Sequence, residues 1–171
     1  MYVLNAGGLD TLYVLDGEDQ VRPIVHLKLG DNPMPESAKS DYEGVDELIM
    51  QQKYSFNVGT IAAAGDMMQL MVFGLKKNPD MDMEDLSTAP IYNLFIRYPD
   101  MKYTVVDFVG DIERKNTAKD AFSELLSPAG VGLLERKGGL KGEHLEAFEA
   151  AQAALLDEED PILMLFKVKV R

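Results

Sequence analysis

The feature that most constrains the fold is a pair of β-rich runs on either side of a turn sequence. Residues 91–98 and 102–109 contain many of the β-branched and aromatic residues that strands favour. Pro99 and Asp100 lie between the runs, and proline is favoured at the first central position of a type I turn. Because the spacing suits a hairpin, the sequence predicts that Ile91–Tyr98 and Lys102–Val109 pair as antiparallel strands.

Residues 2–29 predict a strand meander. Three short β-rich runs are separated by turn-forming residues, first Gly7 with Gly8 and then the segment 16–19. The third run alternates in polarity with a period of two, which is typical of a half-buried strand. Pro23 has no amide hydrogen to give to a sheet, so this strand is expected to begin late or to lie at a sheet edge.

A long loop is predicted over residues 30–44. This segment combines two prolines and a series of polar residues between two glycines, a composition that argues against any regular element. A loop of this length in a compact domain is often functional or disordered. A short helix is expected next, because Val45, Leu48 and Ile49 have the spacing of one helical face.

The segment after this helix fits two structures. Alternation over residues 54–58 and again over 68–72 indicates two strands, with a turn within residues 62–66. A buried helix over 61–75 is the alternative, since Ala and Met are good helix formers. Gly74 and the β-branched and aromatic residues of the second run favour the hairpin.

Two amphipathic helices and a final strand are predicted in the C-terminal third. The first helix is expected to begin at Asn116 or Thr117, where the segment Thr117–Asp120 resembles a capping box, and to end before Ser127 and Pro128. A glycine-rich connector leads to the second helix, over residues 143–156, and residues 162–171 form the strand. The inward side chains of the second helix are expected to be Leu145, Phe148, Gln152, Leu155 and Leu156. In the strand Phe166, Val168 and Val170 alternate with Lys167, Lys169 and Arg171.

The predicted fold class is therefore α+β. It comprises antiparallel strands, arranged as an N-terminal meander plus hairpins, with two amphipathic helices in the C-terminal third and a C-terminal strand. Residues 1–171 are expected to form a single domain, because domains usually contain about 100–200 residues.

Charge and composition exclude some classes of binding partner. The chain carries 29 acidic and 17 basic residues, a formal net charge of −12, and it has no cysteine. Such a charge repels phosphate backbones and anionic lipids, so we expect neither direct nucleic-acid binding nor membrane binding. The sequence shows no signal peptide and no apolar run that approaches the roughly 20 residues of a membrane span. We therefore expect a cytoplasmic protein, or a virion protein if its source is a phage.

No motif indicates catalysis. His26 and His144 are the two histidines, and neither has carboxylates at the spacing of a metal or catalytic site. The acidic segment that starts at Asp80 begins like a calcium loop, but Asp85 replaces its glycine and Ile91 replaces its final glutamate. We expect no catalytic residue, cofactor, nucleotide or metal, which argues against an enzyme without excluding one.

The interpretation we favour is a non-enzymatic interaction or assembly component, which binds a protein partner or further copies of itself, such as a subunit of a virion-type assembly. Methionines in loops suit adaptable protein contacts. We expect basic side chains of the last strand to pair with the acidic loops across such a contact. The candidate contact residues are Met34, Tyr42, Met81, Met83, Leu86, Lys167, Lys169 and Arg171. Two alternatives stay open. One is an acidic inhibitor that mimics nucleic-acid charge, and the other is an enzyme or small-ligand binder whose site is built from scattered residues.

Overall fold

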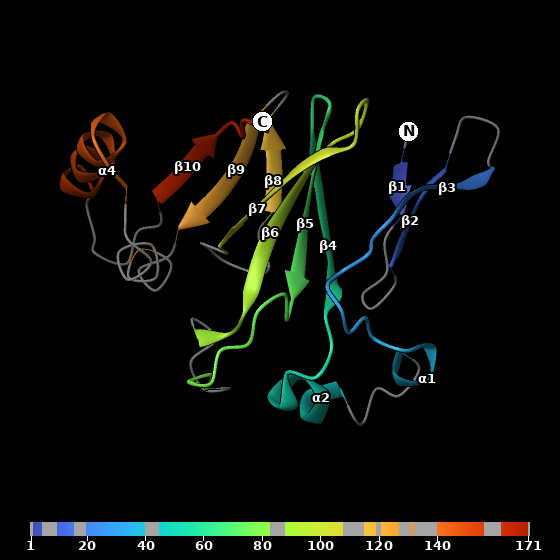
Figure 1. Ribbon diagram of the computed structural model, residues 1–171. Coiled ribbons are helices and arrows are strands. Elements are labelled where there is room, and N and C mark those ends of the chain that lie inside the picture. The colour runs from blue at the N-terminus through green and yellow to red at the C-terminus, as the bar shows by residue number, and fades with distance from the viewer. Residues whose placement is uncertain are drawn as a thin grey trace. The chain divides into compact units, whose positions relative to one another are not determined.

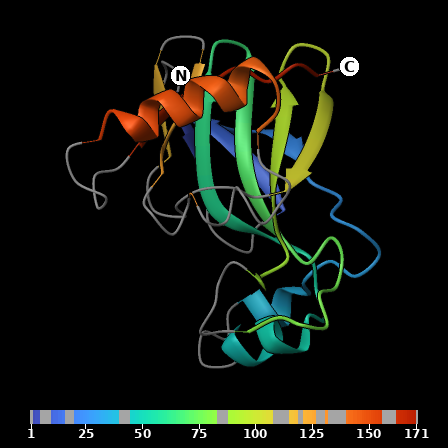
Figure 2. The same ribbon diagram turned by 90° about the vertical axis from the view of Figure 1, so that its left-hand side faces the viewer.

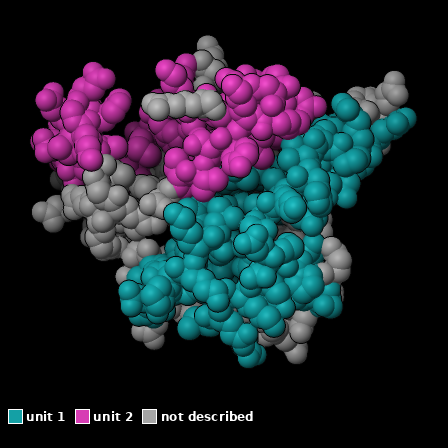
Figure 3. Space-filling view, viewed as in Figure 1, with its two compact units in different colours: residues 1–61, 69–94 teal, residues 62–68, 95–171 magenta. Residues whose placement is uncertain are grey.

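A computed structural model describes residues 2–4, 10–15, 20–39, 45–82, 88–107, 115–118, 121–126, 131, 140–155 and 162–170. In these ranges strands contribute more residues than helices, and most of the strand pairing is antiparallel (Figure 1). The predicted sheet-rich α+β class is therefore confirmed. The chain divides into two compact units, residues 1–61 with 69–94 and residues 62–68 with 95–171 (Figure 3). A single domain over 1–171 stays a prediction.

The N-terminal strands form a three-stranded antiparallel sheet in chain order. Its strands are β1 (Tyr2–Leu4), β2 (Thr11–Leu15) and β3 (Val21–His26). Leu12 and Val14 on β2 are completely buried, whereas their neighbours are half-buried, as a period of two requires. β3 lies at the end of the sheet order. Pro23 stands there, opposite Tyr13 and next to a shift in the strand register, and an edge position tolerates its missing amide hydrogen.

Two short helices follow, α1 (Glu36–Lys39) and α2 (Val45–Gln51). The prediction that residues 30–44 contain no regular element is wrong at α1. The helix begins directly after Pro35, whose carbonyl accepts hydrogen bonds from the amides of Ala38 (2.9 Å) and Lys39 (3.3 Å). Proline suits the start of a helix because its φ angle is already helical. The prolines therefore position this turn of helix instead of excluding it.

A four-stranded sheet has the order β4-β5-β6-β7. Its strands are β4 (Phe56–Ala64), β5 (Met67–Phe73), β6 (Ile91–Arg97) and β7 (Lys102–Asp107). Residues 61–75 thus form strands and not the alternative helix. The turn is shorter than predicted, because β4 continues through Ala64 and only Gly65 and Asp66 separate it from β5. Gly65 has a φ of +60°, a conformation that glycine adopts without strain.

All seven residues of β5 are buried, so the strand is covered on both faces. One polar side chain lies among them. The Gln69 side-chain amide donates a hydrogen bond of 2.8 Å to Asn93 Oδ1 on β6, and both residues are buried. Because both side chains are buried away from water, each one provides the other with a hydrogen-bond partner.

The turn between β6 and β7 spans residues 98–101 and is closed by an ion pair. The Arg97 guanidinium donates to both carboxylate oxygens of Asp100, at 2.9 and 2.6 Å. This hydrogen bonding is the main reason that the pKa of Asp100 is lowered to about 2. The first strand ends at Arg97, one residue earlier than predicted, because Tyr98 belongs to the turn. The second corresponds to the predicted run up to Asp107, and residues 108–109 lie outside the described ranges.

A second three-stranded sheet, in the order β10-β9-β8, lies in the C-terminal unit (Figure 1). Its strands are β8 (Lys115–Ala118), β9 (Ala121–Leu126) and β10 (Ile162–Phe166). The predicted helix over 117–126 is therefore wrong. Ala118 pairs with Ala121 as β8 turns back into β9. Phe122 and Leu126, four residues apart, share a face of a strand as well as a face of a helix, so their spacing did not distinguish the two.

The helix α4 (Glu143–Ala153) is the second of the two predicted C-terminal helices (Figure 2). Phe148 is its buried residue and packs with Leu126 of β9 and Ile162 of β10. Leu145 was predicted to face inward; it is instead 38% exposed and does not belong to this cluster. The helix ends at Ala153, before the predicted end at 156. Gln152 is half-buried, and Leu155 packs against the same cluster from beyond the end of the helix. Leu156 lies outside the described residues.

Candidate interaction surface

The strand β10 lies at the end of its sheet. It pairs antiparallel with β9, from Ile162 opposite Leu126 to Phe166 opposite Phe122. Among the described strands, none is paired with its other edge. Such an edge presents backbone amide and carbonyl groups that a further strand can bind.

One face of β10 is anchored in the core of the C-terminal unit. Ile162 is buried with Leu126 and Phe148, and Met164 packs against the same cluster. Phe166 stacks on Phe122, with the ring centroids 5.8 Å apart. Farther along the chain, Val168 and Val170 belong to the cluster that contains Phe95 and Phe122. The even-numbered residues thus fix the strand firmly in place.

The opposite face of β10 is exposed and apolar. The strand predicted over residues 162–171 ends at Phe166, so Lys167 and Lys169 follow the strand. Leu163 and Leu165 are 61% and 59% exposed, and Lys167 and Lys169 continue the same alternation. The outward face of a half-buried strand normally carries polar residues, so two adjacent exposed leucines are unusual there. We call the set Leu163, Leu165, Lys167 and Lys169 the β10 surface. Its position on a firmly packed edge strand makes it the best candidate for a contact with another protein.

The structure describes four of the eight contact residues proposed from the sequence. Met34 is buried, at 6% exposure, because its amide and those around it join Ser55: Met34 N donates to Ser55 O and Ser55 N donates to Asn32 O. It is therefore a core residue with little surface to offer a partner. Met81 is half-buried. Lys167 and Lys169 are exposed and lie on the β10 surface. The remaining candidates, Tyr42, Met83, Leu86 and Arg171, lie outside the described residues.

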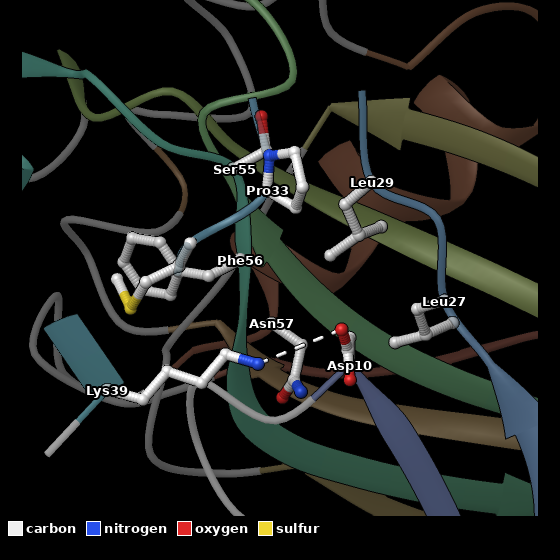
Figure 4. Close-up of a pocket in the computed structure, with 9 residues that line it drawn as sticks. Asp10, Leu27, Leu29, Pro33, Lys39, Ser55, Phe56 and Asn57 are labelled. Carbon is white, nitrogen blue, oxygen red and sulfur yellow. Dashed lines mark ion pairs between the residues drawn. The ribbon is translucent and has the colours of Figure 1, made fainter. Parts of the chain in front are cut away.

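Met34 lines a small pocket in the N-terminal unit (Figure 4). Leu27, Leu29 and Phe56 form part of its wall, and the Lys39 ammonium lies 3.7 Å from the Asp10 carboxylate. The Lys39 side chain is only 8% exposed, so this ion pair fastens α1 against the start of β2. The free volume, about 10 Å³, is close to the minimum that one water molecule needs.

The polar groups around this pocket do not form a catalytic relay. Thr11 Oγ1 and Asp10 Oδ1 both approach the same ring nitrogen of His26, Nδ1, at 3.0 and 3.9 Å. A nucleophile, base and carboxylate relay needs the hydroxyl and the carboxylate on opposite ring nitrogens. Ser55 Oγ donates to the Gly74 carbonyl at 2.8 Å. The polar groups around the pocket therefore hold neighbouring segments together, and their geometry does not indicate catalysis.

No group of three or more His, Asp or Glu side chains is placed to hold a metal ion within the described ranges. Nor does the described part of the chain include a helix with the length and apolar character needed to cross a membrane. Both findings concern these residues and leave the predicted partners and cofactors untested.

Sequence reasoning identified the two lysines of the β10 surface and missed its two leucines. A signal was present, because all five residues of 162–166 are apolar and an edge strand packed on one side buries only every second one. The alternation that begins at Phe166, extended backwards, assigns Leu163 and Leu165 to the same face as Lys167.

Comparison with protein-family models, with curated proteins and with solved structures found no match for this chain. The function must therefore be inferred from the geometry described above.

Proposed function

We propose that this protein functions by binding protein, as a component of an assembly, and that the β10 surface is its contact. One observation carries the proposal: Leu163 and Leu165 are about 60% exposed on a strand whose other face is packed in the core, and the exposed Lys167 and Lys169 follow that strand. We expect such a component in the cytoplasm, or in a virion if the chain comes from a phage.

The chemistry of the surface defines what it binds. Complete burial of a leucine side chain contributes about 1.5–3 kcal/mol, so two leucines that are already more than half exposed offer a substantial gain to a partner that covers them. Lysine stems can cover apolar surface while their charged ends stay in water, and this positive charge favours a partner with carboxylates. The complementary partner therefore presents apolar side chains next to acidic ones.

Rigidity supports the same function. Ordering flexible side chains and loops on binding costs about 0.5–1.5 kcal/mol for each immobilised side chain. The backbone of β10 is already held by its pairing with β9 and by the packing of Ile162 and Phe166. A partner that binds this strand therefore loses little affinity to ordering it.

The test is the size of the complex that contains the chain in an extract of the organism that produces it. Replacing both leucines, Leu163→Thr with Leu165→Thr, removes the apolar contact and keeps residues that favour strands. The matched control is Val21→Thr, which removes a 58% exposed apolar residue from β3.

We expect the wild-type chain and the control to elute with a complex larger than the 19.0 kDa chain, and the double variant to elute at the size of the free chain. Elution of the wild-type chain as a free monomer, or an unchanged complex in the double variant, would refute the proposal.

A further inference from the structure

We infer that Gln52 and Asn78 form a latch that joins the end of α2 to the segment between β5 and β6, so that the two open together as one local unit. This is a conformational device, and it does not depend on the proposed function. Two hydrogen bonds form the latch. The backbone amide of Asn78 donates to Gln52 Oε1 at 2.6 Å, and Gln52 Nε2 donates to the Asn78 carbonyl at 2.5 Å. We call this pair the 52–78 latch.

The latch resembles one step of backbone pairing between strands. The Gln52 side-chain amide offers one acceptor and one donor group, and these meet the amide and the carbonyl of the same residue, 26 positions away. Both residues are half-buried, where a backbone group that loses its partner is costly. One side chain therefore fixes Asn78 against the end of α2. Figure 2 shows the segment that follows β5 passing close to this helix.

Asn78 also organises the segment to which it belongs. Its side chain donates from Nδ2 to the Thr88 carbonyl at 2.6 Å and accepts from the amide of Asp80 at 3.1 Å. Thr88 in turn holds Asp82, because the Asp82 amide donates to Thr88 Oγ1 at 2.7 Å and this hydroxyl donates to the Asp82 carbonyl at 3.2 Å. The described residues 78–82 are therefore tied to each other and to Thr88, and a movement of Asn78 moves them together.

On the helix side, Gln52 adopts a strained conformation. It directly follows α2, its amide donates to the Ile49 carbonyl at 3.0 Å, and its φ is +46°. This left-handed region is unfavourable for a residue with a Cβ, and glycine usually takes the corresponding position after a helix. Such strain persists only where neighbouring contacts maintain it. Opening of the latch relieves the strain, so it costs less than the loss of two unstrained hydrogen bonds would.

The two sides of the latch are therefore linked by hydrogen bonds that backbone strain partly offsets. This balance is expected of a segment that opens locally while the rest of the fold stays closed. The strand β5, which precedes the segment, is buried at every residue and provides a fixed base. The latch thus allows α2 and residues 78–82 to be repositioned without unfolding a sheet.

Hydrogen exchange of single amides, followed by NMR, tests the coupling. Gln52→Ala removes the latch and leaves the acceptors of the Asp80 and Asp82 amides in place. We expect these two amides and those in the last turn of α2 to exchange about tenfold faster, with the amides of β5 unchanged. Gln51→Ala is the matched control, since the exposed Gln51 donates to Glu47 Oε1 of its own helix at 2.9 Å. This variant should leave the Asp80 and Asp82 amides as in the wild type.

Two further variants distinguish the latch from its parts. Gln52→Gly adopts the left-handed conformation without strain and lacks the latch, so residues 78–82 should still exchange faster. Asn78→Ala keeps the backbone groups that meet Gln52 and removes the side chain that holds Thr88 and Asp80. Because coupling between two sites is reciprocal, the last turn of α2 should then exchange faster.

The wild type provides a test that requires no variant. Low concentrations of urea should accelerate exchange at Asp82 and in the last turn of α2 with the same dependence, because one opening exposes both. Different urea dependences at the two places would overturn the inference. Exchange of the Asp80 and Asp82 amides at the wild-type rate in Gln52→Ala, or in Gln52→Gly, would overturn it as well.

Discussion

Gly74 provides a test of the packing between β5 and the segment before β4. Its φ is +75°, and a Cβ built on it would lie 2.4 Å from the backbone oxygen of Tyr54. Real Cβ contacts are essentially never shorter than 3.0 Å. Gly74→Ala must therefore move one of two backbone segments, and backbone cannot rotate away as a side chain can.

The expected loss of stability has two parts. A left-handed conformation costs a residue with a Cβ about 1–2 kcal/mol, of which about 0.4–1 kcal/mol is offset because alanine restricts the unfolded chain. The shift also breaks or weakens two hydrogen bonds of Gly74, from its amide to Pro90 O (2.9 Å) and from Ser55 Oγ to its carbonyl (2.8 Å). Each contributes about 1 kcal/mol. The sum is about 3 kcal/mol.

Alanine variants of two other glycines distinguish the cost of backbone strain from the cost of the steric clash. Gly142 has a φ of +59° and nothing within 4 Å of the built Cβ, so Gly142→Ala should lose about 1 kcal/mol or less from strain alone. Gly30 has a φ of +64°, and the nearest atom to its built Cβ is Ser55 Oγ at 3.2 Å. The stability loss of Gly30→Ala should therefore fall between those of the other two variants. Urea unfolding followed by circular dichroism gives the free energy of unfolding for each variant. Equal losses for Gly74→Ala and Gly142→Ala would refute the steric argument.

Three further predictions concern the core and the β6–β7 turn. Gln69→Leu should lose about 1–3 kcal/mol by leaving the Asn93 amide buried without its partner, and adding Asn93→Leu should recover part of this loss in a double-mutant cycle. Phe122→Ala should lose about 3–5 kcal/mol, because its ring is 1% exposed and lies 5.2 Å from the ring of Phe95, centroid to centroid; Phe122→Leu should lose clearly less in the same urea titration. Arg97→Gln should raise the pKa of Asp100 from about 2 toward the ordinary 3.8, measured by carboxyl NMR titration. Since folding lowers this pKa, the ion pair stabilises the wild type above the unfolded pKa, and this contribution is lost as the pH falls toward 2; Arg97→Gln should lack that dependence.

Local patterns predicted much of the strand content. The β-branched and aromatic runs at Ile91–Arg97 and Lys102–Asp107 are strands because such residues suit a pleated surface. Residues 117–126 were misjudged for a physical reason. Phe122 and Leu126 are buried by contacts with residues distant in sequence, such as Phe95 and Phe148, and no local spacing specifies those contacts.

The candidate surface was only half predictable. Polarity alternates from Phe166 onward, which identified Lys167 and Lys169 as outward-facing. Residues 162–166 are all apolar, so their sequence does not indicate which face of the strand is buried. Contacts with β9 and α4 bury Ile162, and Leu163, on the opposite face, is therefore exposed. Met34 shows the opposite case, a loop methionine that backbone pairing with Ser55 places in the core.

The most direct test of the β10 surface as a protein contact is photo-crosslinking from position 165. Benzoylphenylalanine at Leu165 probes the surface, and the same residue at Glu149, an exposed position on α4, is the control. Both proteins are irradiated in an extract of the source organism, and the crosslinked peptides are sequenced by mass spectrometry. We predict an intermolecular adduct from position 165 that is absent or much weaker from position 149. No intermolecular adduct from position 165, or equal adducts from both positions, would contradict the account.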